Sequence, residues 1–252
     1  DPQPRSARAH LQMTKIRAVT FDLWNTLLTS SPGAVEIRSR FWSEVVDERG
    51  LEIDADLLHG TLSMLPDRFD EEWRAGRQYG PTEALADCFT AFGDRLTSED
   101  RDALAAAFEA ASYELEVAPV ADAADVLSAV AATGVAVGII SDTALATGRH
   151  LRTYLDAYGI FQHVTFAAFS DEVGVYKPDP AIFAAALDGL GIGDPATAAH
   201  VGDLKRTDVA GARAMGMSTV RFRGVVDDPE DGAEADHVID RLADLPRVLG
   251  PG

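Results

Sequence analysis

Short apolar runs and longer amphipathic stretches alternate along two parts of the chain. Five runs have the length and the apolar, partly β-branched content of buried strands, at residues 16–21, 135–140, 164–168, 198–201 and 218–222. Stretches with helical spacing lie among the later runs, at residues 122–132, 147–158, 182–190 and 208–216. Strands that alternate with helices pair in parallel through right-handed crossovers. The pattern therefore predicts an α/β fold built on a doubly wound, Rossmann-like parallel sheet.

The pattern changes between residues 30 and 118, where the strand-like runs disappear. Helical spacing predicts helices over residues 35–49, 55–74, 83–92 and 99–115, with glycines near their ends. We therefore expect a separate, all-helical domain inserted after the first strand. The predicted boundaries are 15–29 and 119–252 for the α/β core and 30–118 for the helical insertion.

Polar side chains follow several predicted strands at the point where each strand ends. Asp22 comes directly after the first run, Ser141 after the second, and Asp203 closely follows the fourth, with Asp208 five residues further on. In a doubly wound sheet, ligands bind beyond the carboxyl ends of the strands. We therefore expect these side chains to converge at one edge of the sheet, together with Lys177, which precedes a predicted helix.

Some of these residues also have an ordinary structural interpretation. Asp22 can cap the turn that follows it, with Asn25 and Thr26 supplying common turn chemistry. Lys177 can be a solvent-facing lysine before a helix. The single cysteine, Cys88, lies in an apolar helical pattern, and we interpret it as a small core residue rather than a nucleophile.

The converging residues have the types needed for phosphoryl transfer. A carboxylate such as Asp22 can attack phosphorus and form an aspartyl-phosphate, which divides one difficult displacement into two easier steps. Since both reactants are anionic, the site needs positive charge. Mg²⁺ usually takes one or two carboxylates, here Asp22 and Asp203, while Asp208 binds the ion directly or orients a water. Lys177 would stabilise the phosphoryl oxygens, and the Ser141 hydroxyl would donate to one of them.

Three segments together resemble the haloacid dehalogenase-like superfamily of hydrolases. They read FDLWNTL from Phe21, KPDPAIF from Lys177 and VGDLKRTDVAGARAMGM from Val201, and the resemblance extends from about Thr14 to the last strand. It implies a helical cap over the active site, at residues 30–118. It also implies that the backbone carbonyl of Trp24 is a further Mg²⁺ ligand.

Trp24 departs from the phosphatases of this family, which generally have an acid–base Asp two residues after the nucleophile. Indole cannot transfer a proton, and losing a positioned acid–base group costs about 10²- to 10⁴-fold in rate. We expect neither Asp142 nor His200 to replace it. The prediction is therefore a weakened, Mg²⁺-dependent phosphatase that acts on a small phosphorylated metabolite.

Two alternatives come from other classes of protein. The 2-haloacid dehalogenases have an aromatic Tyr at the position of Trp24 and need no metal. However, the Asp203 and Asp208 pair does not suit them, because an anion-rich pocket would repel a haloacid carboxylate. The other alternative is a non-catalytic binding protein on the same fold.

Composition limits the partners of this chain. Its net charge of -19, from 41 acidic and 22 basic residues, argues against sequence-independent nucleic-acid binding. No apolar run is long enough to cross a membrane. Residues 1–14 form a predicted tail, and residues 1–12 lack the apolar core of a signal peptide, so we expect a cytoplasmic protein.

The helical insertion contains several arginines, and the sequence does not tell which of them contact a ligand. Most are expected to be solvated or paired with neighbouring acids. One or two that face the cleft could hold an anionic substrate, because a guanidinium matches the geometry of phosphate or carboxylate. The candidates are Arg38, Arg40, Arg49, Arg68, Arg74 and Arg77.

Overall fold

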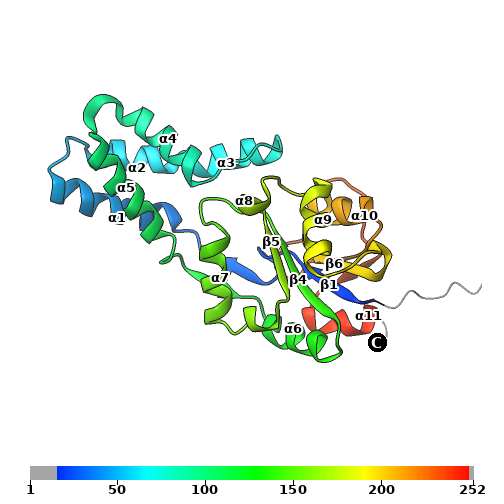
Figure 1. The fold of residues 1–252 in the computed structure, drawn as a ribbon. Coiled ribbons are helices and arrows are strands. Elements are labelled where there is room, and N and C mark those ends of the chain that lie inside the picture. Colours follow the sequence, from blue (N-terminus) through cyan, green and yellow to red (C-terminus); the bar gives the residue numbers. More distant parts are fainter. Residues whose placement is uncertain (1–15, 250–252) are drawn as a thin grey trace, which may run out of the picture.

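The computed structural model describes residues 16–249, and its centre is a six-stranded parallel sheet (Figure 1). The strand order is β5-β4-β1-β6-β7-β8, and every neighbouring pair is parallel. This confirms the predicted α/β class. The strands are β1 (Ala18–Phe21), β4 (Ala136–Ser141), β5 (Phe166–Phe169), β6 (Ala198–Gly202), β7 (Ser218–Phe222) and β8 (His237–Ile239).

Helices cover both faces of the sheet, which explains why its central strands are apolar throughout. On one face, β1 packs with α6 (Ala123–Ala132), α7 (Gly148–Ala157) and α11 (Leu245–Leu249). On the other face lie α9 (Pro180–Gly189) and α10 (Ala210–Ala214). The short helix α8 (Ser170–Val173) follows β5. All four residues of β1 are buried, as expected for a central strand.

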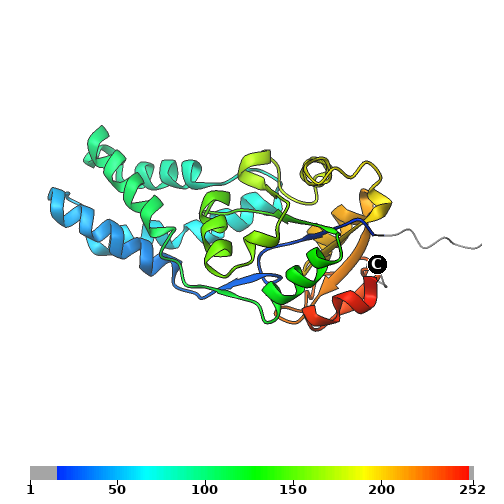
Figure 2. The ribbon, with the colours of Figure 1, turned by 60° about the horizontal axis from the view of Figure 1, so that its bottom comes forward.

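Five helices lie between the first and second strands of the main sheet, and they form a group to one side of it (Figures 1 and 2). They have their own apolar cluster, centred on Trp42, Phe92 and Phe108. The helices are α1 (Ala34–Arg49), α2 (Ala55–Ser63), α3 (Leu65–Arg74), α4 (Pro81–Phe92) and α5 (Ser98–Ala111). The assignment of residues 30–118 as a separate cap domain stays a prediction.

Two details of this region differ from the sequence-based expectation. The single helix predicted over residues 55–74 is divided at Met64, because Pro66 lies in the first turn of α3 and has no N–H for an intrahelical bond. A two-stranded antiparallel ribbon, β2 (Leu28–Ser30) with β3 (Val117–Pro119), joins the helices to the core and was not predicted. The predicted tail, residues 1–14, lies outside the described residues.

Candidate active site

The loop after β1 carries Asp22 at the carboxyl edge of the sheet. The backbone N–H of Asp22 donates to the carbonyl of Val201 at 2.8 Å, which extends the pairing of β1 with β6. Asn25 then adopts a left-handed conformation with φ of 59°, which asparagine tolerates better than most residues. The chain consequently turns away from the sheet, and Asp22 stays at its edge with only 5% of its surface exposed.

Lys177 is the cation at the centre of the site. Its ammonium donates to Oδ1 of Asp22 at 2.5 Å and to Oδ1 of Asp208 at 2.7 Å. The exposed fraction of the Lys177 side chain is 3%. Burial alone lowers the pKa of a lysine, but the Asp208 and Asp22 carboxylates outweigh it and raise the pKa of Lys177. Lys177 is therefore a fixed positive charge and not the solvent-facing lysine of the structural alternative.

Asp208 is held in place by four neighbours, three of them close and one, the Thr207 hydroxyl, at 3.5 Å. Besides Lys177, its carboxylate accepts the backbone N–H of Leu204 at 3.0 Å and lies 3.1 Å from Nε2 of His200. Burial opposes ionisation, yet Lys177 and His200 hold the pKa of Asp208 below its usual range. A Cβ at Gly202 would lie 2.3 Å from Cγ of Asp208, so this close approach requires glycine.

Asp203 lies next to this pair with little compensation for its charge. Its carboxylate has one long contact, 3.5 Å from Nδ2 of Asn25. Burial, and then the charges of Asp22 and Asp208, raise the pKa of Asp203 to about 8. Burial likewise raises the pKa of Asp22 to about 7, although Lys177 acts in the opposite direction. The cluster holds more negative charge than its one lysine neutralises.

The donor set fits a divalent cation. One carboxylate oxygen from each of Asp22, Asp203 and Asp208 lies within 4.8 Å of the others, and all three residues are buried. Oδ2 of Asp22 is buried and has no hydrogen-bond partner among the described residues. Since unpaired buried oxygens are costly, a bound cation would relieve both the missing contact and the mutual repulsion.

Asp142 connects this cluster to the helical insertion. Its Oδ1 accepts the backbone N–H of Lys177 and its Oδ2 accepts the indole N–H of Trp73 on α3, each at 2.8 Å. Burial raises the pKa of Asp142, but both oxygens accept hydrogen bonds, which suits the ionised form. Asp142 is therefore placed to orient Lys177, not to donate a proton.

A cavity of about 260 Å³ brings the predicted residues together. Five of the sequence-based candidates line it, namely Asp22, Trp24, Lys177, Asp203 and Asp208. Ser141 does not line this cavity. Its side chain is fully buried, and its hydroxyl donates to the carbonyl of Asp142 at 3.0 Å.

Sequence reasoning missed several lining residues. Phe69, Asp70 and Trp73 come from α3, so the helical insertion contributes one wall of the cavity. Their helical spacing gave no indication of this, because it is equally typical of residues that pack inside the insertion. By contrast, Asp142 directly follows Ser141 at the predicted strand end, but from the sequence it was considered only as a replacement acid–base group.

His200 does not line the cavity. Its ring is buried behind Asp208, with Nδ1 2.8 Å from the Thr20 hydroxyl and Nε2 facing the carboxylate. Burial lowers the pKa of His200 and so favours its neutral ring. This geometry gives His200 a positioning role behind Asp208.

Comparison with known proteins identifies relatives in two reaction classes. The chain is 31% identical over 238 residues to glyceraldehyde 3-phosphate phosphatase from Methanopyrus kandleri, covering 93% of this chain and 95% of that protein. It is 27% identical over 239 residues to (S)-2-haloacid dehalogenase 1 from Pseudomonas sp. strain CBS-3, covering 94% and 98%. A HAD phosphatase structure from Thermococcus onnurineus superimposes with a TM-score of 0.64 at 25% identity, covering 93% and 98%.

A family model of the haloacid dehalogenase-like hydrolases matches residues 16–216, which include both the sheet edge and the helical insertion. The match spans every charged residue of the cluster described above. The chain belongs to the haloacid dehalogenase-like hydrolases.

Proposed function

We propose that this hydrolase is a Mg²⁺-dependent phosphatase that acts on a small phosphorylated metabolite. The observation that carries the proposal is the excess of buried carboxylate around Lys177, with one oxygen of Asp22 unpaired. Such a cluster is costly unless a cation occupies it. The phosphatase relative, aligned over nearly its whole length, supports the same reaction class.

Asp22 is the proposed nucleophile. It attacks phosphorus, the bond to the substrate oxygen breaks, and the alcohol leaves with a proton from solvent. Water then attacks the aspartyl-phosphate, which releases inorganic phosphate and restores the carboxylate. Lys177 holds Asp22 in position and faces the developing charge, while Asp142 and Asp208 fix Lys177.

Asp22, Asp203 and Asp208 are the proposed Mg²⁺ ligands, and the family resemblance adds the backbone carbonyl of Trp24. The bound ion would supply positive charge that neutralises the phosphoryl group and the carboxylates. Ser141 remains a proposed donor to a phosphoryl oxygen. It would have to turn its hydroxyl from the carbonyl of Asp142 to act in this way.

Metal-independent 2-haloacid dehalogenase activity is the second candidate. One observation favours it: Trp24 lines the cavity beside Asp22, in the position where the dehalogenases have an aromatic residue. The dehalogenase relative is also aligned over nearly its full length. Against it stand Asp203 and Asp208 beside Asp22, because three acidic side chains around one lysine suit a cation better than a haloacid carboxylate.

A paired assay tests the two candidates. Phosphate release from a panel of phosphate esters is measured with Mg²⁺ and with EDTA, beside halide release from 2-chloropropionate. We expect Mg²⁺-dependent phosphate release that Asp203→Asn abolishes. Halide release that survives EDTA would instead establish the dehalogenase, and the absence of both activities would favour the third alternative, a non-catalytic binding protein.

The remaining expectations concern partners and location. The proposed partner is a phosphate ester, and the expectation of no nucleic-acid partner rests on net charge alone. Within residues 16–249, none of the helices has both the length and the apolarity that crossing a membrane requires. A cytoplasmic location stays a prediction.

A further inference from the structure

A second cavity adjoins the proposed active site and contains a buried arginine. Its volume is about 260 Å³, and it shares Trp24, Phe69 and Ala144 with the cavity at Asp22. Its other walls come from the start of α1 and from the loop after β4, where the insertion meets the core. Arg38 lines this second cavity, and only 4% of its surface is exposed.

Arg38 has no acidic partner in the described part of the chain. No carboxylate oxygen among residues 16–249 lies within 4.0 Å of its guanidinium nitrogens, although several other arginines of the insertion are paired. Its contacts are long: Nη1 donates to the carbonyl of Ala34 at 3.5 Å and Nη2 to the hydroxyl of Ser112 at 3.4 Å. Its Nε is buried and has no hydrogen-bond partner in the described part of the chain.

The remaining contact of Arg38 does not replace an anion. The guanidinium carbon lies 4.7 Å from the centre of the Phe108 ring on α5, a cation–π contact of modest strength. Burial lowers the pKa of Arg38 to about 10, so the side chain is still charged at pH 7. A buried, charged and underbonded guanidinium is costly, and an anionic ligand group in the cavity would offset that cost.

The charge and lining of the cavity favour a carboxylate over a second phosphate. Among residues 16–249, Arg38 is the only basic residue that lines it, and the acidic Glu116 lines it as well. A monoanion would balance one guanidinium, whereas a phosphate dianion would leave a charge uncompensated near Glu116. Most of the other lining side chains are apolar, including Ile37, Leu115 and Leu145.

We propose that Arg38 recognises a carboxylate at the far end of the substrate, whose apolar body lies across Trp24 in the second cavity. This inference rests on the proposed function for the position of the phosphoryl group at Asp22. The substrate class is thus a phosphate ester with an apolar body and a remote carboxylate. A 2-haloacid does not fit this description, since its carboxylate is bonded to the reacting carbon.

The test compares esters that differ in one charge. Hydrolysis of 3- and 4-carboxyphenyl phosphate is measured beside that of 3- and 4-carbamoylphenyl phosphate, whose ring substituent is uncharged. We expect kcat/KM to favour at least one carboxylate ester by about 10- to 100-fold, the range for a charge-assisted bond. Arg38→Met should remove this preference, and Arg38→Lys should retain part of it. Arg40→Met is the control, because Arg40 is exposed on the same helix.

A binding measurement separates this inference from the proposed function. Benzoate should raise the melting temperature of Asp22→Asn protein without Mg²⁺, and it should not do so when Arg38→Met is added. That result supports the carboxylate site even if no ester is hydrolysed, in which case only the proposed function fails. Equal hydrolysis of both ester types by the parent protein would overturn the inference, as would a preference that persists in Arg38→Met.

Stability gives a readout that does not depend on turnover. If the role of Arg38 is to bind a ligand, the ligand-free Arg38→Met protein should unfold at the same or a higher temperature than the parent, because a buried unpaired charge is removed. A purely structural arginine predicts the opposite. A marked loss of stability in both Arg38→Met and Arg38→Lys, without any effect of benzoate on the parent, would overturn the proposal.

Discussion

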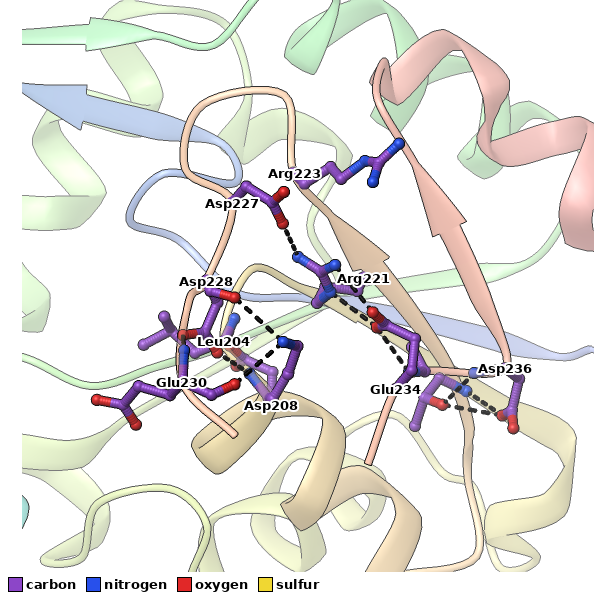
Figure 3. Close-up of polar contacts among 12 residues, drawn as sticks. Leu204, Asp208, Arg221, Arg223, Asp227, Asp228, Glu230, Glu234 and Asp236 are labelled. Atoms are coloured by element: carbon purple, nitrogen blue, oxygen red, sulfur yellow. Dashed lines mark hydrogen bonds and ion pairs between the residues drawn. The ribbon is translucent and has the colours of Figure 1, made fainter. Parts of the chain in front are cut away.

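The molecule has two clusters of charge built around a buried cation, Lys177 in one and Arg221 in the other. Figure 3 shows the second cluster, in which carboxylates from the loop that precedes β8 accept hydrogen bonds from Arg221 on β7. Nε and Nη2 of Arg221 donate to Glu234 at 2.8 and 2.9 Å, and Nη1 donates to Asp227 at 2.8 Å. Every nitrogen of this buried guanidinium is paired.

The two clusters differ in where their carboxylates lie. Glu234 and Asp227 are 47% and 63% exposed, so water solvates their remaining charge. Asp22 and Asp208 are 7% and 2% exposed, and Asp203 adds a third buried carboxylate to a single ammonium. The comparison teaches that charge density alone does not mark a ligand site. An unpaired atom in a buried cluster does mark one, and the Arg221 cluster has none among the described residues.

The largest expected effect comes from Asp22→Asn. Because the amide cannot attack phosphorus, phosphatase activity should fall by about four to six orders of magnitude. Glu234→Gln, in the paired cluster, should leave activity unchanged and serves as the matched control. Steady-state phosphate release measures both variants. Residual activity within tenfold of the parent in Asp22→Asn would show that Asp22 is not the nucleophile.

The next effect concerns Trp24. Without an acid–base group, the parent protein should hydrolyse aryl phosphates far better than alkyl phosphates, since a good leaving group needs no proton. Trp24→Asp should narrow that gap by about 10²- to 10⁴-fold, the usual contribution of such a group. Parallel assays of one aryl and one alkyl ester give the ratio for each protein. An unchanged ratio would mean that another residue already transfers the proton.

Mg²⁺ should stabilise the Lys177 cluster, which has more carboxylates than positive charges. At a concentration one hundred times its Kd, an ion bound only to the folded state adds about 2.7 kcal/mol, which raises Tm by roughly 5–10 °C for a chain of this size. Asp203→Asn should abolish the shift, and Glu234→Gln should not change it. Thermal unfolding with Mg²⁺ and with EDTA provides the measurement. An equal shift in parent and Asp203→Asn would remove Asp203 from the metal site.

Much of the candidate site at the sheet edge was predictable because strand ends are local features. Asp22 and Asp203 each lie at the end of an apolar run, and a parallel sheet brings such ends to one edge. Lys177 was found from its segment, and its contacts with Asp22 and Asp208 follow the expectation. The resemblance to the family predicted that these segments form one site, and the family model has since shown the membership.

Contacts that depend on packing between distant elements were not predictable. Arg38 and Arg40 are alike in the sequence, and only the packing of α1 against α5 buries the first and exposes the second. The bond from Trp73 to Asp142 joins residues 69 positions apart. The ribbon of β2 and β3 likewise pairs two three-residue segments from opposite ends of the insertion, and neither has a strand pattern of its own.

The smallest expected effect concerns the Arg221 cluster, in which every guanidinium nitrogen is paired. The hydrogen bond from Arg221 lowers the pKa of Glu234 to about 2, against an ordinary value of 4.5. A folded-state pKa below the unfolded value means that the contribution to stability is present above pH 4.5 and is lost as the pH falls toward 2. Because Glu234 is about half exposed, we expect Glu234→Gln to cost about 1 kcal/mol or less at pH 7.

Urea unfolding between pH 7 and pH 3 measures the free energy of unfolding of the parent, Glu234→Gln, Arg221→Met and the double variant. These four proteins form a mutant cycle that gives the coupling energy between Glu234 and Arg221. The coupling between the two residues should be constant from pH 7 to about pH 5 and should shrink below about pH 4.5, as Glu234 becomes protonated in the unfolded chain. A coupling energy that is zero at pH 7 would mean that full pairing does not make this cluster stabilising. A coupling energy above about 3 kcal/mol would match a buried ion pair, and the contrast in burial with the Lys177 cluster would then fail.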